Sequence, residues 1–195
     1  GAGTGYLRGM GQGANEGTLI VDNAGVPSVV GTLISSNVTD ASVRDVVIRN
    51  AGILALDLNQ SLTVSGIWSN GASFSGTSGA ASVFAGSGVS TSTVYGNTTF
   101  AGLVCATPGK TIQFAADSTN AVLDALTLAG APGSNIVLRS TADGSAWKLR
   151  LITSTIQSIS RADVKDSDAR PGMVVTAVRS VDNGNNSNWV FTVEG

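Results

Sequence analysis

The chain has 195 residues, of which 12% are charged and 42% hydrophobic, and its formal net charge at pH 7 is −2. The apolar content excludes an intrinsically disordered chain, and the near-neutral charge without a Lys/Arg cluster argues against nucleic acids and anionic membranes as partners. Every apolar run is much shorter than the roughly 20 residues of a membrane-spanning helix, so no membrane span is expected.

The first seventeen residues, GAGTGYLRGMGQGANEG, are rich in glycine and carry Tyr6, Leu7 and Met10 as isolated large apolar groups. Ordering glycine costs much backbone entropy, so residues 1–17 are predicted to form an arm rather than a folding unit. Such an arm needs a surface to dock on, either its own domain or a neighbouring subunit. The chain begins at Gly1 rather than Met and has no signal-peptide pattern, which favours a mature secreted protein over a trimmed chain.

Residues 18–68 contain short apolar runs separated by turn-forming Asn, Asp and Gly, the pattern of an all-β fold. In residues 69–96 small side chains dominate, and large apolar groups recur only at intervals. That spacing favours ordered, narrow strands over a flexible linker. We expect residues 18–195 to form one domain, with a sub-boundary near residues 69–96.

From residue 97 onward, strand-like runs recur along the chain. One series begins at residues 111, 135, 155 and 173, and a second begins at residues 121, 146, 161 and 188. Interleaved runs about 15 to 27 residues apart, without a helical segment, predict a β-solenoid with two strand faces per turn. Its first well-defined turn is expected to span residues 98–130. Within this turn, Cys105, Phe114 and Leu128 are predicted to be core residues. The alternative fold is a β-solenoid preceded by a β-sandwich within residues 18–96.

A set of short motifs in a fixed order carries a family resemblance over residues 97–191. In sequence they are Phe100-x-x-Leu103-x-Cys105, Pro108-Gly109-Lys110-Thr111, Leu126-Thr-Leu128-x-Gly130, Ile136-x-Leu138-Arg139-Ser140, Trp147-x-Leu149, Asp163-Val-Lys165-Asp166-Ser167-Asp168-Ala169 and Asp182-x-Gly184-Asn185-Asn186-x-Asn188-Trp189-x-Phe191. Together they resemble a module that recurs in large secreted bacterial surface proteins. The resemblance implies a right-handed parallel β-helix with a structural or adhesive role, and it brings no catalytic residues.

The residue types leave little for catalysis. Without histidine the chain lacks the commonest general base and transition-metal ligand, and the single Cys105 lies in a strand-like run, typical of a buried hydrophobe. We therefore expect no enzyme, no catalytic residues and no cofactor. A polysaccharide-lyase chemistry that uses a basic side chain stays open as a weaker alternative, with Arg139, Lys148 and Arg150 as its candidates.

Three carboxylates, Asp163, Asp166 and Asp168, form the one acidic cluster. Calcium prefers such oxygen donors, but the spacing does not follow the EF-hand loop, and neighbouring basic residues can neutralise the cluster. A solvated turn with local ion pairs is the favoured interpretation, no metal site is assigned, and calcium binding is left open.

The polar segment 180–188 precedes Trp189 and is predicted to form a solenoid corner in which Asn side chains bond the backbone. Sugar binding through these Asn side chains and Trp189 is the alternative. Packing inside or between turns is the expected role of all three tryptophans. Asn-x-Ser/Thr sequons are compatible with a glycosylated surface protein and occur at Asn37, Asn59, Asn97 and Asn185.

These observations predict a structural subunit of a secreted extracellular filament or matrix, localised outside the cell or at its surface. An uncapped solenoid has unpaired backbone groups at its ends, so we expect it to homopolymerise head to tail through these ends and the arm. The residues predicted to mediate assembly are Tyr6, Leu7, Met10, Trp189 and Phe191. The alternative function is an adhesin or carbohydrate-binding β-helix module with a glycan as its partner.

Overall fold

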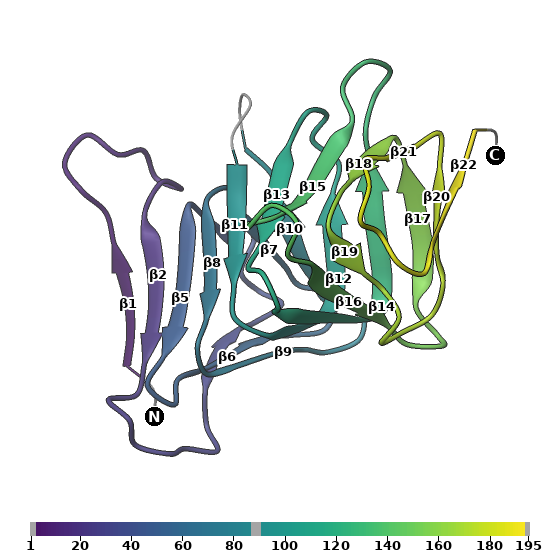
Figure 1. The fold of residues 1–195 in the computed structure, drawn as a ribbon. Coiled ribbons are helices and arrows are strands. Elements are labelled where there is room, and N and C mark those ends of the chain that lie inside the picture. The colour runs from purple at the N-terminus through teal and green to yellow at the C-terminus, as the bar shows by residue number, and fades with distance from the viewer. Residues whose placement is uncertain (1–2, 87–90, 194–195) are drawn as a thin grey trace.

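The computed structural model describes residues 3–86 and 91–193, and within them the chain contains strands but no helix. The strands run parallel and stack into a β-solenoid of about seven turns, with the first turn at the left of Figure 1 and the last at the right. The all-β solenoid predicted from the recurring strands is therefore confirmed.

Each turn has three sides, which we call the first, second and third faces. The first face is a nine-stranded sheet, parallel except for its N-terminal strand, and it contains β1 (Gly3–Leu7), β2 (Thr18–Asp22), β5 (Asp45–Arg49), β8 (Ile67–Asn70), β11 (Thr91–Tyr95), β13 (Thr111–Phe114), β15 (Ile136–Ser140), β18 (Ala162–Val164) and β21 (Val181–Asp182).

The third face lies opposite, in a ten-stranded sheet that also includes strands of the second face. It contains β4 (Ser42–Val43), β7 (Ser61–Val64), β10 (Ala81–Phe84), β12 (Thr98–Cys105), β14 (Thr119–Ala129), β17 (Ile156–Ser160), β20 (Val175–Val178) and β22 (Trp189–Thr192). The second face joins these two and contains β3 (Thr32–Ile34), β6 (Ile53–Leu56), β9 (Ser73–Gly76), β16 (Trp147–Leu151) and β19 (Ser167–Asp168).

The long strands β12 and β14 serve two faces each. Residues 119–122 of β14 pair with β16, whereas residues 125–129 pair with β17. The β12–β14 register shifts between Phe100 and Gly102, where the ladder bends around the corner. A single continuous strand thus covers the second and third sides of these turns.

The assignment of later strands to two series is wrong, because each turn has three sides of unequal length. The strands that begin at residues 111, 136 and 162 share the first face, and those that begin at 156, 175 and 189 share the third. Each predicted series combined strands of different faces, because these strands recur along the chain at similar intervals. The β-sandwich alternative also fails, since β2, β5, β8 and β11 pair in sequence within the first face.

Large side chains fill the interior of the solenoid. Trp68 lies 4.7 Å from Phe74 and 5.4 Å from Phe100, measured between ring centroids, and Phe114 stacks on Trp147 at 4.0 Å. The predicted core residues Cys105, Phe114 and Leu128 are all buried, as are Trp68 and Trp147. These contacts run from turn to turn, so each turn buries the apolar layer of the next.

The corners between the first and second faces use left-handed backbone. The φ angles there are 82° at Gly96, 62° at Asp117, 80° at Gly144, 57° at Asp166 and 55° at Asn185. Gly, Asn and Asp tolerate this conformation, which explains why turn-forming residues punctuate the sequence. At Gly96 the backbone also approaches closely, because a Cβ atom there would lie 2.0 Å from the carbonyl oxygen of Asn70.

We predict that Gly96→Ala lowers the free energy of unfolding by at least about 3 kcal/mol, because backbone strain and a backbone clash add together. Gly133→Ala is the control: Gly133 has a φ of 72° but no atom within 4 Å of its added Cβ. It should cost only about 1 kcal/mol. Equal losses in denaturant unfolding would contradict the close packing at this corner.

Candidate assembly surfaces

Exposed apolar side chains gather at the two ends of the solenoid. Among the described residues sixteen large hydrophobic side chains are exposed, of which eight precede residue 44, four follow residue 173, and only four lie between. Exposed apolar residues scattered singly need no explanation, but a concentration of this kind marks an interaction surface. The ends are therefore the candidate functional sites.

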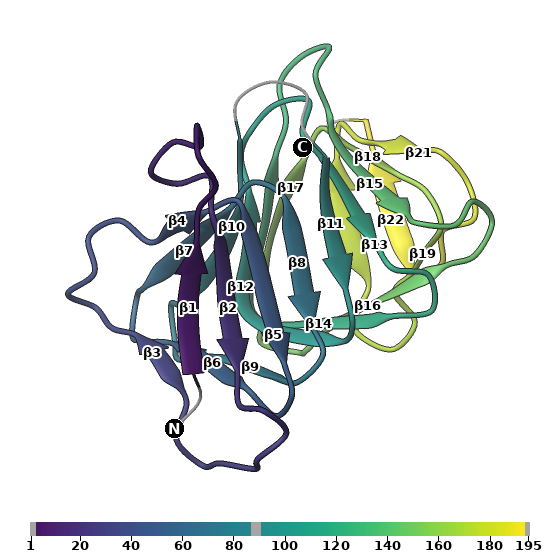
Figure 2. The ribbon, with the colours of Figure 1, turned by 90° about the vertical axis from the view of Figure 1, so that its left-hand side faces the viewer.

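The arm folds back on its own domain at the N-terminal end, where β1 pairs antiparallel with β2, as Figure 2 shows. The hydroxyl of Tyr6 donates a hydrogen bond to the carbonyl of Ala14 and accepts one from the amide of Gly17 at 3.1 Å. Tyr6 thus ties the base of the arm, a role that its spacing in the sequence did not reveal. Leu7 and Met10 remain exposed to solvent.

A hollow of about 380 Å³ opens at the N-terminal end between the arm and the first turn. Its floor is apolar, because Leu19, Ile34 and Ala41 form the outermost layer packed against the core. Its rim includes the exposed Leu33 and Val38. The remaining lining residues are Thr4, Tyr6, Ala14, Asn15, Thr32, Asp40, Ser42, Val43 and Leu62. This hollow could not be predicted from the sequence, since its lining residues come together only when the turns stack.

The C-terminal end presents an aromatic layer. Trp189 and Phe191 lie on β22 with ring centroids 5.7 Å apart, and the indole Nε1 of Trp189 donates to the hydroxyl of Ser167 at 3.0 Å. Both side chains are half-buried against the core, whereas Val190 between them is exposed. They terminate the interior stack, because β22 is the last strand of the third face.

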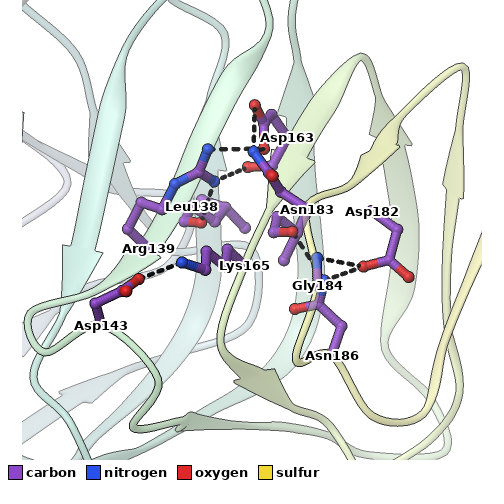
Figure 3. A network of polar contacts seen from close by, with 10 residues as sticks. Leu138, Arg139, Asp143, Asp163, Lys165, Asp182, Asn183, Gly184 and Asn186 are labelled. Atoms are coloured by element: carbon purple, nitrogen blue, oxygen red, sulfur yellow. Dashed lines mark hydrogen bonds and ion pairs between the residues drawn. The ribbon is translucent and has the colours of Figure 1, made fainter.

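A polar network holds the last turns together, as Figure 3 shows. Arg139 forms an ion pair with Asp163 at 2.8 Å and also donates to the main-chain carbonyls of Leu138 and Asp163. Asn186 donates to the carbonyl of Val164 at 2.8 Å and to Asp182 at 2.6 Å, and it accepts from the amide of Ser167 at 3.0 Å. The Asn side chain thereby replaces strand pairing where β21 has become very short, as expected for Asn at a solenoid corner.

The three carboxylates of the acidic cluster go to different partners. Asp163 pairs with Arg139, Asp168 pairs with Arg170, and the buried Asp166 accepts hydrogen bonds from Asn185 at 2.7 Å and from the amide of Gly144 at 3.1 Å. The Arg170 guanidinium beside Asp168 lowers the pKa of that carboxyl. No group of three His, Cys, Asp or Glu side chains in the described part of the chain could hold a metal ion.

The basic candidates for lyase chemistry do not converge on one site. Arg139 lies on β15 of the first face, whereas Lys148 and Arg150 lie on β16 of the second. Arg139 is also engaged with Asp163. The geometry gives this alternative no support.

The lysine at position 110 lies inside the solenoid. Lys110 is fully buried at the start of β13, and its ammonium donates to the carbonyl of Ser65 at 2.9 Å. Burial lowers the pKa of Lys110 below its ordinary value of 10.5, and burial raises the pKa of the nearby Cys105 thiol. A lysine in a Pro-Gly-Lys turn is expected to face solvent, so its inward position could not be predicted from the sequence.

No family model, curated protein or solved structure matches the chain. No helix long and apolar enough to cross a membrane occurs in residues 3–86 and 91–193.

Asn186→Ala should loosen the last turn at a cost of about 1 to 3 kcal/mol, because two hydrogen bonds to the preceding turn and one within the last turn are lost. Amide hydrogen exchange over residues 181–192 should accelerate, while residues 111–140 keep their protection. Asn183→Ala is the control, since the amide of the exposed Asn183 side chain donates to the carboxylate of Asp163 alone, at 3.2 and 3.5 Å. Equal acceleration in both variants would contradict the role given to Asn186.

Lys110 should make stability depend on pH. Because its pKa is lowered on folding, the folded chain releases this proton at a lower pH than the unfolded chain does. The contribution of Lys110 to stability should therefore rise as the pH increases through the lowered pKa toward 10.5. In denaturant titrations, the free energy of unfolding of the native chain should rise relative to that of Lys110→Met over this range. Parallel pH profiles would show that folding leaves this pKa unchanged.

Proposed function

We propose that this protein is a structural subunit, without catalytic activity, that stacks head to tail into an extracellular filament or matrix. The observation that carries the proposal is the concentration of exposed apolar side chains at both ends of the solenoid, where strand edges are also open. Open edges and apolar ends are normally capped in monomeric solenoids, and here the covering is partial.

The strand order supports continuation from one copy to the next. The third face begins at β4 and ends at β22, and both strands have the same direction within one parallel sheet. A second copy placed on the C-terminal end would bring its β4 beside β22 at the ordinary strand spacing of about 4.8 Å. On the first face, β21 of one copy would meet β1 of the next, so the arm supplies the added strand.

The interior layers are also complementary. The aromatic layer of Trp189 and Phe191 would face the apolar hollow floored by Leu19, Ile34 and Ala41. Burying aromatic side chains against such a floor provides the driving force that the short edge strands lack. A contact between two different surfaces does not close on itself, so it generates a fibre rather than a ring or dimer.

Composition and sequence resemblance support an extracellular location. Charged residues are few, which lowers the repulsion between packed copies. The single thiol, Cys105, is buried, so no exposed free cysteine occurs in the described residues. The resemblance of residues 97–191 to a module of secreted bacterial surface proteins points in the same direction.

A glycan-binding module is the second candidate, favoured by a hollow of about 520 Å³ between β17 and β20. Here Gln157 bridges the strands, donating to the carbonyl of Val174 at 2.9 Å and accepting from the amide of Thr176 at 3.0 Å. Uncharged amide and hydroxyl groups suit sugar hydroxyls, and they come from Gln157, Ser158, Ser160 and Thr176. Trp189 is engaged with Ser167 and Phe191, so it does not serve this site.

The filament proposal predicts that Leu33→Lys prevents end-to-end assembly, because it places a charge at the rim of the apolar hollow. Leu58→Lys is a matched control, since Leu33 and Leu58 are both 55% exposed but Leu58, between β6 and β7, does not line the hollow. Electron microscopy should show fibres for the native chain and the control, and discrete particles for Leu33→Lys. Native protein that stays monomeric at every concentration, or fibres of Leu33→Lys as long as the native ones, would overturn the proposal.

A further inference from the structure

The outer side of the third face carries one charged side chain in its described strands, Asp124 of β14, which lies at the corner with the second face. Side chains on a strand alternate between the interior and solvent, and the solvent-facing ones line up from turn to turn. The central row contains only hydroxyl-bearing and valine side chains: Ser42, Thr63, Val83, Val104, Thr127, Ser158, Thr176 and Val190.

The rows on either side are equally free of charge. One contains Ser61, Ala81, Gly102, Ala125 and Ile156, and the other contains Ala129, Ser160, Val178 and Thr192. Small residues make the middle of the first of these rows a shallow strip beside the β-branched central row. The central row therefore forms a ridge, and the neighbouring row of small residues forms a strip into which the ridge of another copy can pack.

The other two faces differ in this respect. Ion pairs join neighbouring turns on the outside of the first face, between Arg49 and Asp22 and between Arg139 and Asp163. Strands β16 and β19 of the second face carry Lys148, Arg150 and Asp168. The three rows of the third face are thus uncharged along the solenoid, and depletion of charge is the compositional mark of an interface core.

The size of this face fits a protein partner. Eight strands about 4.8 Å apart extend about 35 Å along the solenoid, and three rows span about 15 Å across it. Two such faces in contact would bury roughly 1,000 Å², the lower limit for a specific interface. Apart from the hollow between β17 and β20, the three rows form an uncharged surface that is complementary in shape to itself, so this face fits a second copy of the chain.

We propose that two copies of this chain pair laterally, third face against third face, as two sheets packed about 10 Å apart in the manner of a β-sandwich. The pair is isologous, so each residue of the central row lies in the interface once from each copy. This contact does not depend on end-to-end stacking; where both operate, the fibre is two solenoids wide.

Sedimentation equilibrium over a range of concentrations tests the pairing, in a Leu33→Lys background that blocks end-to-end growth. The background chain is expected to dimerise. Adding Ile156→Lys or Val104→Lys should weaken the dimer at least about tenfold, because each places two lysines in one uncharged interface. Ile156 is 70% exposed, so its replacement leaves the fold intact, which circular dichroism verifies.

Ile67→Lys is the matched control, an isoleucine that is 43% exposed on the first face. It should leave the dimer unchanged. A background chain that stays monomeric, or dimers that persist with Ile156→Lys, would overturn lateral pairing. Monomers that bind insoluble cellulose through this face would also overturn it and assign the face to a polysaccharide. If Leu33→Lys still forms fibres, the end-to-end interface is wrong, and fibre width in micrographs then reports pairing on its own: two solenoids wide supports it and one contradicts it.

Discussion

Hydrogen bonding between successive turns is the constraint on which this structure depends. The strands are mostly two to five residues long, so none is stable alone, and each has its backbone groups satisfied by the turns before and after it. The interior follows the same rule, because each apolar layer is buried by its neighbours. The first and last turns each lack one neighbour, so their outer backbone groups and apolar side chains are not covered by another turn.

The two ends cover their exposed strand edges and apolar layers with different groups. At the N-terminus a glycine-rich hairpin, tied by Tyr6, adds one antiparallel strand to the first face but leaves an apolar hollow above Leu19 and Ile34. At the C-terminus, Asn and Asp side chains replace strand pairing, while Trp189 and Phe191 close the interior incompletely. Each end is ordered enough to present a defined surface and open enough to accept another copy.

Much of the fold could be predicted from the sequence, because short strands, turn residues and apolar alternation report local conformation directly. Core positions such as Cys105, Phe114 and Leu128 followed from this alternation. The number of faces could not be predicted in this way, because loops of unequal length make strands of different faces recur at similar intervals along the chain. The hollow at the N-terminal end, the buried Lys110 and the uncharged third face depend on register between distant turns, which leaves no local signal. Tyr6 and Trp189 were predicted as assembly residues, yet their polar atoms already have partners within the same chain.

The most direct test of end-to-end stacking is disulfide trapping between Ser42→Cys and Val190→Cys in one chain. Both positions lie in the central row of the third face, Ser42 on its first strand and Val190 on its last, so they cannot meet within one molecule. Across a head-to-tail junction they would occupy neighbouring strands, about 5 Å apart between Cα atoms, within disulfide range. Cys105 is buried and should not interfere. End-to-end stacking predicts a ladder of covalent oligomers on oxidation, and no ladder when Val190→Cys is combined with Ile67→Cys. Monomers alone, or the same ladder in both variants, would contradict it.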